Sequence, residues 1–286
     1  AERPGGSRGG QFAKIVVPAT EVLDSKDPNG ARERLSLMGV KYLWRLVDED
    51  IVLTGGGLVV RDFMLNGDAV SSANVAKLTC KSKKETESFL FVGRPAPDDF
   101  NGGLLKVKEK DPRVSRLEAG DSFTVGAWVK LMPVSLRDET SPHNLPRGFM
   151  PLLTRSGSRS HEWIAQLTTE RLYLNLDRGV TGQNDMNQQL PWWAHTYGTC
   201  WNGRYSEECW HFVAVAVDPK KNRAQFVIVR REGNNLPGHT EDFSQLLETD
   251  KVLNGMAIPS RSGAELLIGG DGGASVHGLL RGVFFA

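Results

Sequence analysis

The stretch Gly120-Asp-Ser-Phe-Thr-Val-Gly-Ala-Trp-Val-Lys-Leu131 decides the fold class of this chain. Its side chains alternate in character, with one set at Phe123, Val125, Ala127 and Val129 and the other at Thr124, Gly126, Trp128 and Lys130. Successive side chains of a strand point to opposite faces of its sheet, so a period of two is typical of a strand between two different environments. The stretch therefore predicts a β-strand.

Four other passages show strand signals of the same kind. They are Phe149-Met-Pro-Leu-Leu153, Arg171-Leu-Tyr-Leu-Asn-Leu176, Cys209-Trp-His-Phe-Val-Ala-Val-Ala-Val217 and Leu266-Leu-Ile-Gly-Gly270. Turn signals such as Asp218-Pro-Lys-Lys-Asn222 separate them. Many short strands between turns predict an all-β domain.

The order of these motifs resembles the laminin-G-like jelly roll of the concanavalin-A-like lectin/glucanase superfamily. The matching passages are Asp121 to Lys130, Trp210 to Val215, Leu266 to Gly270 and a closing strand from Gly278 to Phe285. One departure is Val229-Arg-Arg-Glu-Gly233, where the family has a Tyr-Val-Asp-Gly turn. The resemblance is clearest from residue 88 and implies an antiparallel jelly-roll sandwich of two sheets.

The first 50 residues are expected to form a separate arm and helix, and residues 51–286 the sandwich. Residues 1–12 are rich in glycine and read as an extended arm. Asp27 and Pro28 suit a helix start. Apolar residues then recur at spacings of three and four, which predicts one amphipathic helix ending near Asp48; they are Leu35, Met38, Tyr42, Leu43, Leu46 and Val47.

Two strands are expected directly after this helix. Ile51-Val-Leu-Thr54 and Leu58-Val-Val-Arg-Asp-Phe-Met-Leu65 flank the turn Gly55-Gly-Gly57, and Asn66-Gly67 closes the second strand. We expect this pair at the edge of the sandwich.

Composition disfavours several classes of partner. The net charge is +1, from 35 basic and 34 acidic side chains, so there is no overall field that would attract nucleic acid or anionic lipid. No run approaches the roughly 20 apolar residues of a membrane helix. The start Ala1-Glu-Arg-Pro-Gly-Gly fits a processed chain of an organelle or a secreted protein, and it fits a cloning boundary equally well.

The cysteines leave the compartment open. Cys200 and Cys209 bracket a polar turn and would close a small disulfide loop in an oxidising compartment, with Cys80 left over.

The chain shows no recognisable catalytic or metal motif. Retaining glucan hydrolases need two carboxylates about 5 Å apart, and no such pairing of Glu and Asp occurs on a predicted strand. The histidines lack metal-ligand spacing. Gly269-Gly-Asp-Gly-Gly273 reads as a tight turn, and Asp271 alone supplies too few oxygens for a calcium site at the sandwich rim. We predict no enzyme activity, no cofactor and no metal.

An aromatic segment is the most distinctive candidate binding site. It contains Trp192, Trp193, Tyr197, Trp201 and the neighbouring Asn202. Indole rings stack on sugars and also anchor protein interfaces. A loop that packs on itself at one end of the sandwich is the structural alternative.

We therefore expect a non-catalytic interaction or scaffold subunit of a larger protein assembly. Its partner chains would bind the N-terminal arm, the helix face with Leu35, Leu43 and Leu46, and the sandwich loops. The alternative is a carbohydrate-binding lectin-like module that uses the tryptophan segment, and a third possibility is a polysaccharide-active enzyme.

Overall fold

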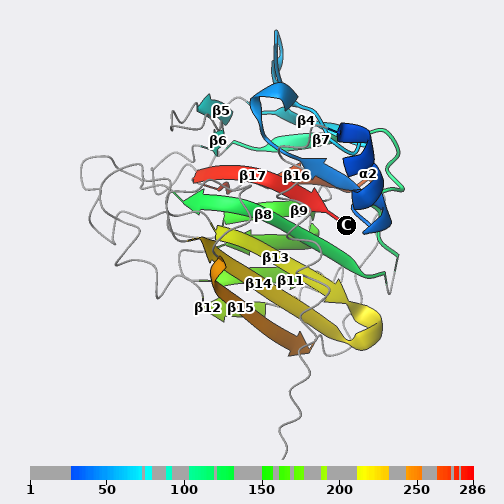
Figure 1. The fold of residues 1–286 in the computed structure, drawn as a ribbon, viewed down its shortest axis with the longest axis vertical. Coiled ribbons are helices and arrows are strands. Elements are labelled where there is room, and N and C mark those ends of the chain that lie inside the picture. Colours follow the sequence, from blue (N-terminus) through cyan, green and yellow to red (C-terminus); the bar gives the residue numbers. More distant parts are fainter. Residues whose placement is uncertain are drawn as a thin grey trace, which may run out of the picture.

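The computed structural model describes residues 27–72, 75–78, 88–91, 103–118, 121–131, 150–156, 161–167, 171–176, 188–191, 211–231, 243–252, 263–271, 274–276 and 278–286. In this part of the chain two antiparallel sheets pack face to face, and one α-helix, α2 (Pro28–Leu37), lies beside them (Figure 1). The fold is the all-β two-sheet sandwich with one helix that the sequence predicts. The arm predicted at residues 1–12 lies outside the described residues.

The first sheet has the strand order β15-β14-β13-β8-β17-β6-β5, with β1 also paired to β17. Its strands are β1 (Tyr42–Trp44), β5 (Val75–Leu78), β6 (Ser88–Phe91), β8 (Phe123–Leu131), β13 (His211–Asp218), β14 (Arg223–Arg231), β15 (Phe243–Val252) and β17 (Gly278–Phe285). A 3-10 turn, η3 (Pro219–Lys221), joins β13 to β14, and Asn222 closes it with a left-handed φ of 54°.

The second sheet has the order β12-β11-β10-β9-β16-β7-β4-β3-β2. Its strands are β2 (Ile51–Thr54), β3 (Gly57–Val60), β4 (Gly67–Ser71), β7 (Leu105–Glu109), β9 (Met150–Ser156), β10 (His161–Leu167), β11 (Arg171–Leu176), β12 (Gln188–Pro191) and β16 (Glu265–Ile268). A 3-10 turn, η1 (Asp48–Asp50), precedes β2. The strands predicted around residues 120–131, 149–153, 171–176, 209–217 and 266–270 are all present.

The main core lies between the two sheets. It is formed by the inward-facing set of the alternating strands, such as Val125, Ala127 and Val129 of β8. Trp163 of the second sheet stacks on Phe285 of the first, with ring centroids 5.8 Å apart and planes 5° apart. Burial of these large rings contributes to the driving force for sheet packing, together with the aliphatic side chains of the same core.

A second apolar cluster covers the outer face of the first sheet. Trp128, Phe212 and Phe284 meet there, and Ala31 and Leu35 of α2 pack against the same cluster. Because the main core and this cluster cover opposite faces of β17, all eight of its residues are buried in spite of their alternating directions. The position of α2 next to the end of β17 is visible in Figure 1.

The predicted helix is too long. α2 ends at Leu37. Just beyond it, Gly39 adopts a φ of 87° and Val40 donates its N–H to the Leu35 carbonyl, which closes the helix end. Residues Tyr42–Trp44 then form β1, with Tyr42 opposite Phe285 and Trp44 opposite Val283. The expected extension of the helix to Asp48 is therefore wrong. The apolar residues Tyr42–Trp44 beyond Gly39 form a strand whose two faces are both buried.

This strand also moves the start of the sandwich. β1 belongs to the first sheet although it precedes the boundary expected at residue 50, so within the described residues the sandwich already includes Tyr42 to Trp44.

Candidate functional site

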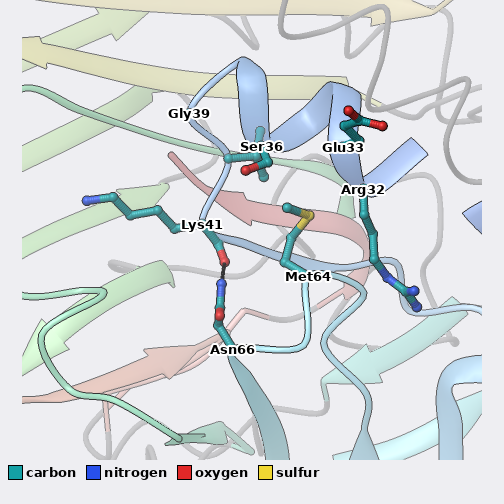
Figure 2. Close-up of a pocket in the computed structure, with 8 residues that line it drawn as sticks. Arg32, Glu33, Ser36, Gly39, Lys41, Met64 and Asn66 are labelled. Atoms are coloured by element: carbon teal, nitrogen blue, oxygen red, sulfur yellow. Dashed lines mark hydrogen bonds between the residues drawn. The ribbon is translucent and has the colours of Figure 1, made fainter. Parts of the chain in front are cut away.

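A shallow depression beside α2 is the candidate site. It has a volume of about 560 Å³ and is widely open to solvent (Figure 2). Its walls come from α2, from the segment that leads into β1 and from the turn after β3; the lining residues are Arg32, Glu33, Ser36, Gly39, Val40, Lys41, Met64 and Asn66. Two separate pieces of chain therefore meet at this surface, residues 32–41 and residues 64–66.

Asp62 fixes the turn that forms one wall. Its carboxylate accepts backbone N–H groups from Leu43 at 2.9 Å, Met64 at 3.0 Å, Asn66 at 2.7 Å and Gly67 at 3.1 Å. One buried side chain therefore satisfies donors from β1, from the turn and from β4. Burial raises the pKa of Asp62 to about 6, although the four N–H groups act in the opposite direction.

Two further contacts hold the same turn in place. Asn66 donates its side-chain N–H to the Lys41 carbonyl at 2.6 Å, which Figure 2 shows as the link between two walls. Leu65 has a φ of 65° and donates its N–H to the Asp62 carbonyl. The left-handed conformation is uncommon for leucine, and the Leu65 side chain is 52% exposed.

The buried ring of Phe63 ties α2 to this turn. The Arg32 guanidinium carbon lies 4.9 Å from the ring centroid, and Arg32 Nε donates to the Phe63 carbonyl at 2.6 Å. The guanidinium carbon of Arg45 lies 4.6 Å from the same centroid. Arg45 also forms a two-point ion pair with Asp50, with both N–O distances 2.6 Å.

The elements that line the depression carry exposed leucines as well as charged side chains. Leu37, one helical turn after Glu33, is 83% exposed. Arg32, Glu33 and Lys41 supply charges of both signs. We call this region, formed by Arg32, Glu33, Ser36, Leu37, Lys41, Leu65 and Asn66, the α2 surface.

A separate polar network is enclosed between the sheets. Glu109 of β7 accepts a hydrogen bond from Tyr42 of β1 at 3.0 Å and lies 3.5 Å from Arg155 of β9. Arg155 pairs with Glu162 at 2.8 Å and donates to Ser115. Burial, followed by the charge of Glu109, raises the pKa of Tyr42. The network links the sheets, and both of its carboxylates have structural partners.

The described residues contain no group of three or more His, Cys, Asp or Glu side chains that could hold a metal ion. Asp271 accepts the Ala274 N–H at 2.8 Å, so it caps the glycine-rich turn after β16. Within the same ranges, no helix has the length and apolar character needed to span a bilayer.

The predicted site residues fall into two groups, one outside the described residues and one buried in the core. Trp192, Trp193, Tyr197, Trp201 and Asn202 lie outside the described residues, as do all three cysteines. The predicted helix face does not form an exposed surface, because Leu35, Leu43 and Leu46 are at most 1% exposed. The expectation that these leucines contact a partner is corrected, since they complete the core of the chain itself.

Sequence reasoning missed the residues that form the α2 surface. Asn66-Gly67 gave a turn signal, but nothing local showed that Asp62 would collect four backbone donors around it. Arg32 and Lys41 are ordinary charges in the sequence, and only the packing of α2 beside β1 brings them to one depression.

Comparisons with known proteins concern the fold alone. No family model matches the sequence, and no curated protein matches it. Among solved structures, a heptameric SAP-like pentraxin from Limulus polyphemus shares 14% identity, with 69% of this chain and 74% of that chain covered and a TM-score of 0.39. Arcelin-5, a lectin-like defense protein from Phaseolus vulgaris, shares 10% identity, with 77% and 97% covered and a TM-score of 0.36.

A third solved structure is lectin I from Ulex europaeus in complex with the methyl glycoside of α-L-fucose. It shares 11% identity, with 76% of this chain and 97% of that chain covered and a TM-score of 0.34.

Proposed function

We propose that this chain is a non-catalytic interaction module that binds a partner protein through the α2 surface. The observation that carries the proposal is the depression of about 560 Å³ between α2 and the turn at residues 62–66, with an exposed leucine on each of these two elements. Within the class of two-sheet sandwiches, the sequence motifs favour the laminin-G-like type.

Rigidity of the walls supports the proposal. The Asp62 carboxylate, the Asn66 to Lys41 hydrogen bond and the contact of Arg32 with Phe63 hold both pieces of chain in one arrangement. A surface that is already ordered loses little conformational entropy on binding, so more of the contact energy appears as affinity.

The side chains of the α2 surface suit a protein better than a sugar. Leu37 and Leu65 would leave water on contact with an apolar partner surface, while the charges around them would fix its orientation. Stacking on a sugar ring needs an exposed aromatic face. The aromatic side chain next to this depression, Phe63, is only 4% exposed.

The partners of the buried carboxylates support a non-catalytic role. Glu109 and Glu162 flank Arg155 between the sheets, and Asp62 and Asp50 are bound to backbone donors and to Arg45 respectively. A catalytic carboxylate must reach a substrate, whereas these groups stabilise the sandwich.

The test begins with the native particle. We would purify it gently from its source, measure its mass by light scattering and identify the chains that accompany the 31.5 kDa protein. A photocrosslinker at Ser36 should then link this chain to a stoichiometric partner, and the same crosslinker at Lys220, which is exposed on η3, should not.

The decisive measurement uses the purified partner. Leu37→Glu and Leu65→Glu should each weaken its binding roughly tenfold, the factor that corresponds to about 1.4 kcal/mol. Lys220→Glu is the control, because it introduces the same side chain at an exposed position on η3, and it should bind like the wild type. The proposal would be wrong if the protein were a free monomer in its native source, or if all variants bound the partner with equal affinity. Either result would favour glycan binding by Trp192 and Trp193.

A further inference from the structure

The outer edge of β2 is open in the described part of the chain. β2 is the last strand of the second sheet and pairs only with β3 there. The hairpin of these two strands projects beyond the rest of the sandwich, as the light-blue element at the top of Figure 1. It is separate from the α2 surface.

The backbone of Leu53 faces this open edge. Leu53 lies opposite Leu58 of β3, and Leu58 donates its N–H at 2.8 Å to Ser71 Oγ on β4, away from β2. In an antiparallel pair, opposite residues either exchange both hydrogen bonds or direct both sets of groups outward. Leu53 therefore directs its N–H and C=O to the side where a further strand would lie, and Ile51, two residues earlier, does the same.

The side chains of β2 are also incompletely covered. Leu53 shares a face with Leu58, because the two lie opposite each other, and Leu58 is in the core at 6% exposure. Leu53 is 76% exposed, whereas Ile51 on the same face packs partly against the core. The apolar inner face of the sheet thus continues past the point where the other sheet covers it.

The β2–β3 hairpin lacks three common protections against strand pairing, namely charge, proline and a bulge. The hairpin Ile51-Val-Leu-Thr-Gly-Gly-Gly-Leu-Val-Val60 contains no charged residue and no proline. The pairing of β2 with β3 is regular over four residues, without a bulge. Edges of this kind are templates for another strand.

We propose that a second copy of this chain pairs with β2 through its own β2, antiparallel about a two-fold axis. In this register Ile51 lies opposite Leu53 of the second copy, and Val52 lies opposite Val52. The outward groups of Ile51 and Leu53 then form two hydrogen-bonded pairs. Each exposed Leu53 becomes a neighbour of Ile51 on the inner face, and the second sheet continues across both copies.

The chemistry of the edge favours a second copy over an unlike peptide. A neutral edge offers no charge complementarity to a charged partner, and it meets its own copy without repulsion. The arrangement is self-complementary, as a two-fold interface requires. A contact of four residues per copy is small, and small interfaces are weak, so the dimer Kd should lie between about 1 µM and 1 mM.

The first experiment is sedimentation equilibrium of the full chain from about 1 µM to 1 mM. The wild type should pass from monomer to dimer with rising concentration. Leu53→Lys should raise the Kd at least tenfold, and Leu53→Pro should do the same, because it removes the outward N–H while the hydrogen bonds to β3 persist. Leu37→Lys is the matched control, since it introduces the same charge at an equally exposed leucine on α2.

A mixing experiment tests the two-fold directly. Leu53→Lys and Leu53→Glu chains should each be monomeric alone and should form a heterodimer together, because the two positions are diagonal neighbours across the axis. Far-ultraviolet circular dichroism and the unfolding midpoint confirm that the variants are folded.

Three outcomes would overturn the proposal. They are a wild type that remains monomeric up to 1 mM, a Leu53→Lys chain that dimerises like the wild type, and a Leu37→Lys chain that loses dimerisation to the same extent. The last outcome would place the contact on the α2 surface.

Discussion

The ring of Phe284 occupies the space that a side chain on Gly126 would need. A Cβ at Gly126 would lie 2.6 Å from Phe284 Cε1 and 2.8 Å from the Val213 carbonyl oxygen. The two residues are paired across β8 and β17 on the outer face of the first sheet. Position 126 of β8 must therefore be glycine, because the ring of Phe284 on β17 fills the space beside it.

Gly126→Ala should lower the free energy of unfolding by about 1 to 3 kcal/mol, the usual cost of overpacking a core. Urea denaturation would measure it. Gly55→Ala is the control, because nothing lies within 4 Å of a Cβ there, and it should change stability by less than about 0.5 kcal/mol. Phe284→Leu should recover part of the loss in the double variant; full stability of Gly126→Ala alone would contradict this packing.

Asp62→Ala should destabilise the fold by about 2 to 4 kcal/mol, because buried N–H groups of Leu43 and Gly67 lose their acceptor. Asp62→Asn should cost less, since its amide oxygen still accepts from Leu43 and Met64. Chemical denaturation would rank the two variants. The reverse order, or no loss in either, would show that the carboxylate does not hold the turn.

The contribution of Asp62 to stability should depend on pH. Burial raises its pKa in the folded state from 3.8 to about 6, so the folded state binds the proton more tightly than the unfolded chain. The contribution is therefore fully present below about pH 4 and is lost as the pH rises through about 6. Its size is about 3 kcal/mol at most.

The measurement is the difference in unfolding free energy between wild type and Asp62→Asn at several values from pH 4 to pH 7. This difference should shrink steadily over the range, because the asparagine does not titrate. A constant difference would mean that the pKa of Asp62 stays near its ordinary value.

Arg155→Met should cost about 3 to 5 kcal/mol, because it leaves Glu109 and Glu162 buried without their shared cation. The double variant Arg155→Met with Glu162→Gln should regain part of this loss. Thermal and urea unfolding would report both values.

Lys106→Met provides a control on the same sheet. Lys106 pairs with Glu265, but both side chains are about half exposed, so its loss should stay within about 1 kcal/mol. An equal cost for the two substitutions would show that burial of the Arg155 network has no special weight.

Local patterns predicted the strands well. The alternation in residues 123–131 and the turn at Asp218 to Asn222 depend on neighbours in sequence, and both appear where expected. The helix prediction failed beyond Leu37 because a spacing of three and four does not distinguish a longer helix from a short helix followed by a strand buried on both faces. Tyr42, Leu43 and Trp44 satisfy either pattern, and pairing with β17 decides between them.

The sequence by itself determined that this chain is an all-β sandwich, because period-two alternation and turn residues act over a few positions. Only the tertiary structure decided which side chains meet. Asp62 is one acidic residue among 34 acidic side chains until β1, the turn and β4 direct their N–H groups at it. Leu35 and Leu43 became core and Leu37 and Leu53 became surface, because burial depends on what lies across the sheet and not on hydrophobicity alone.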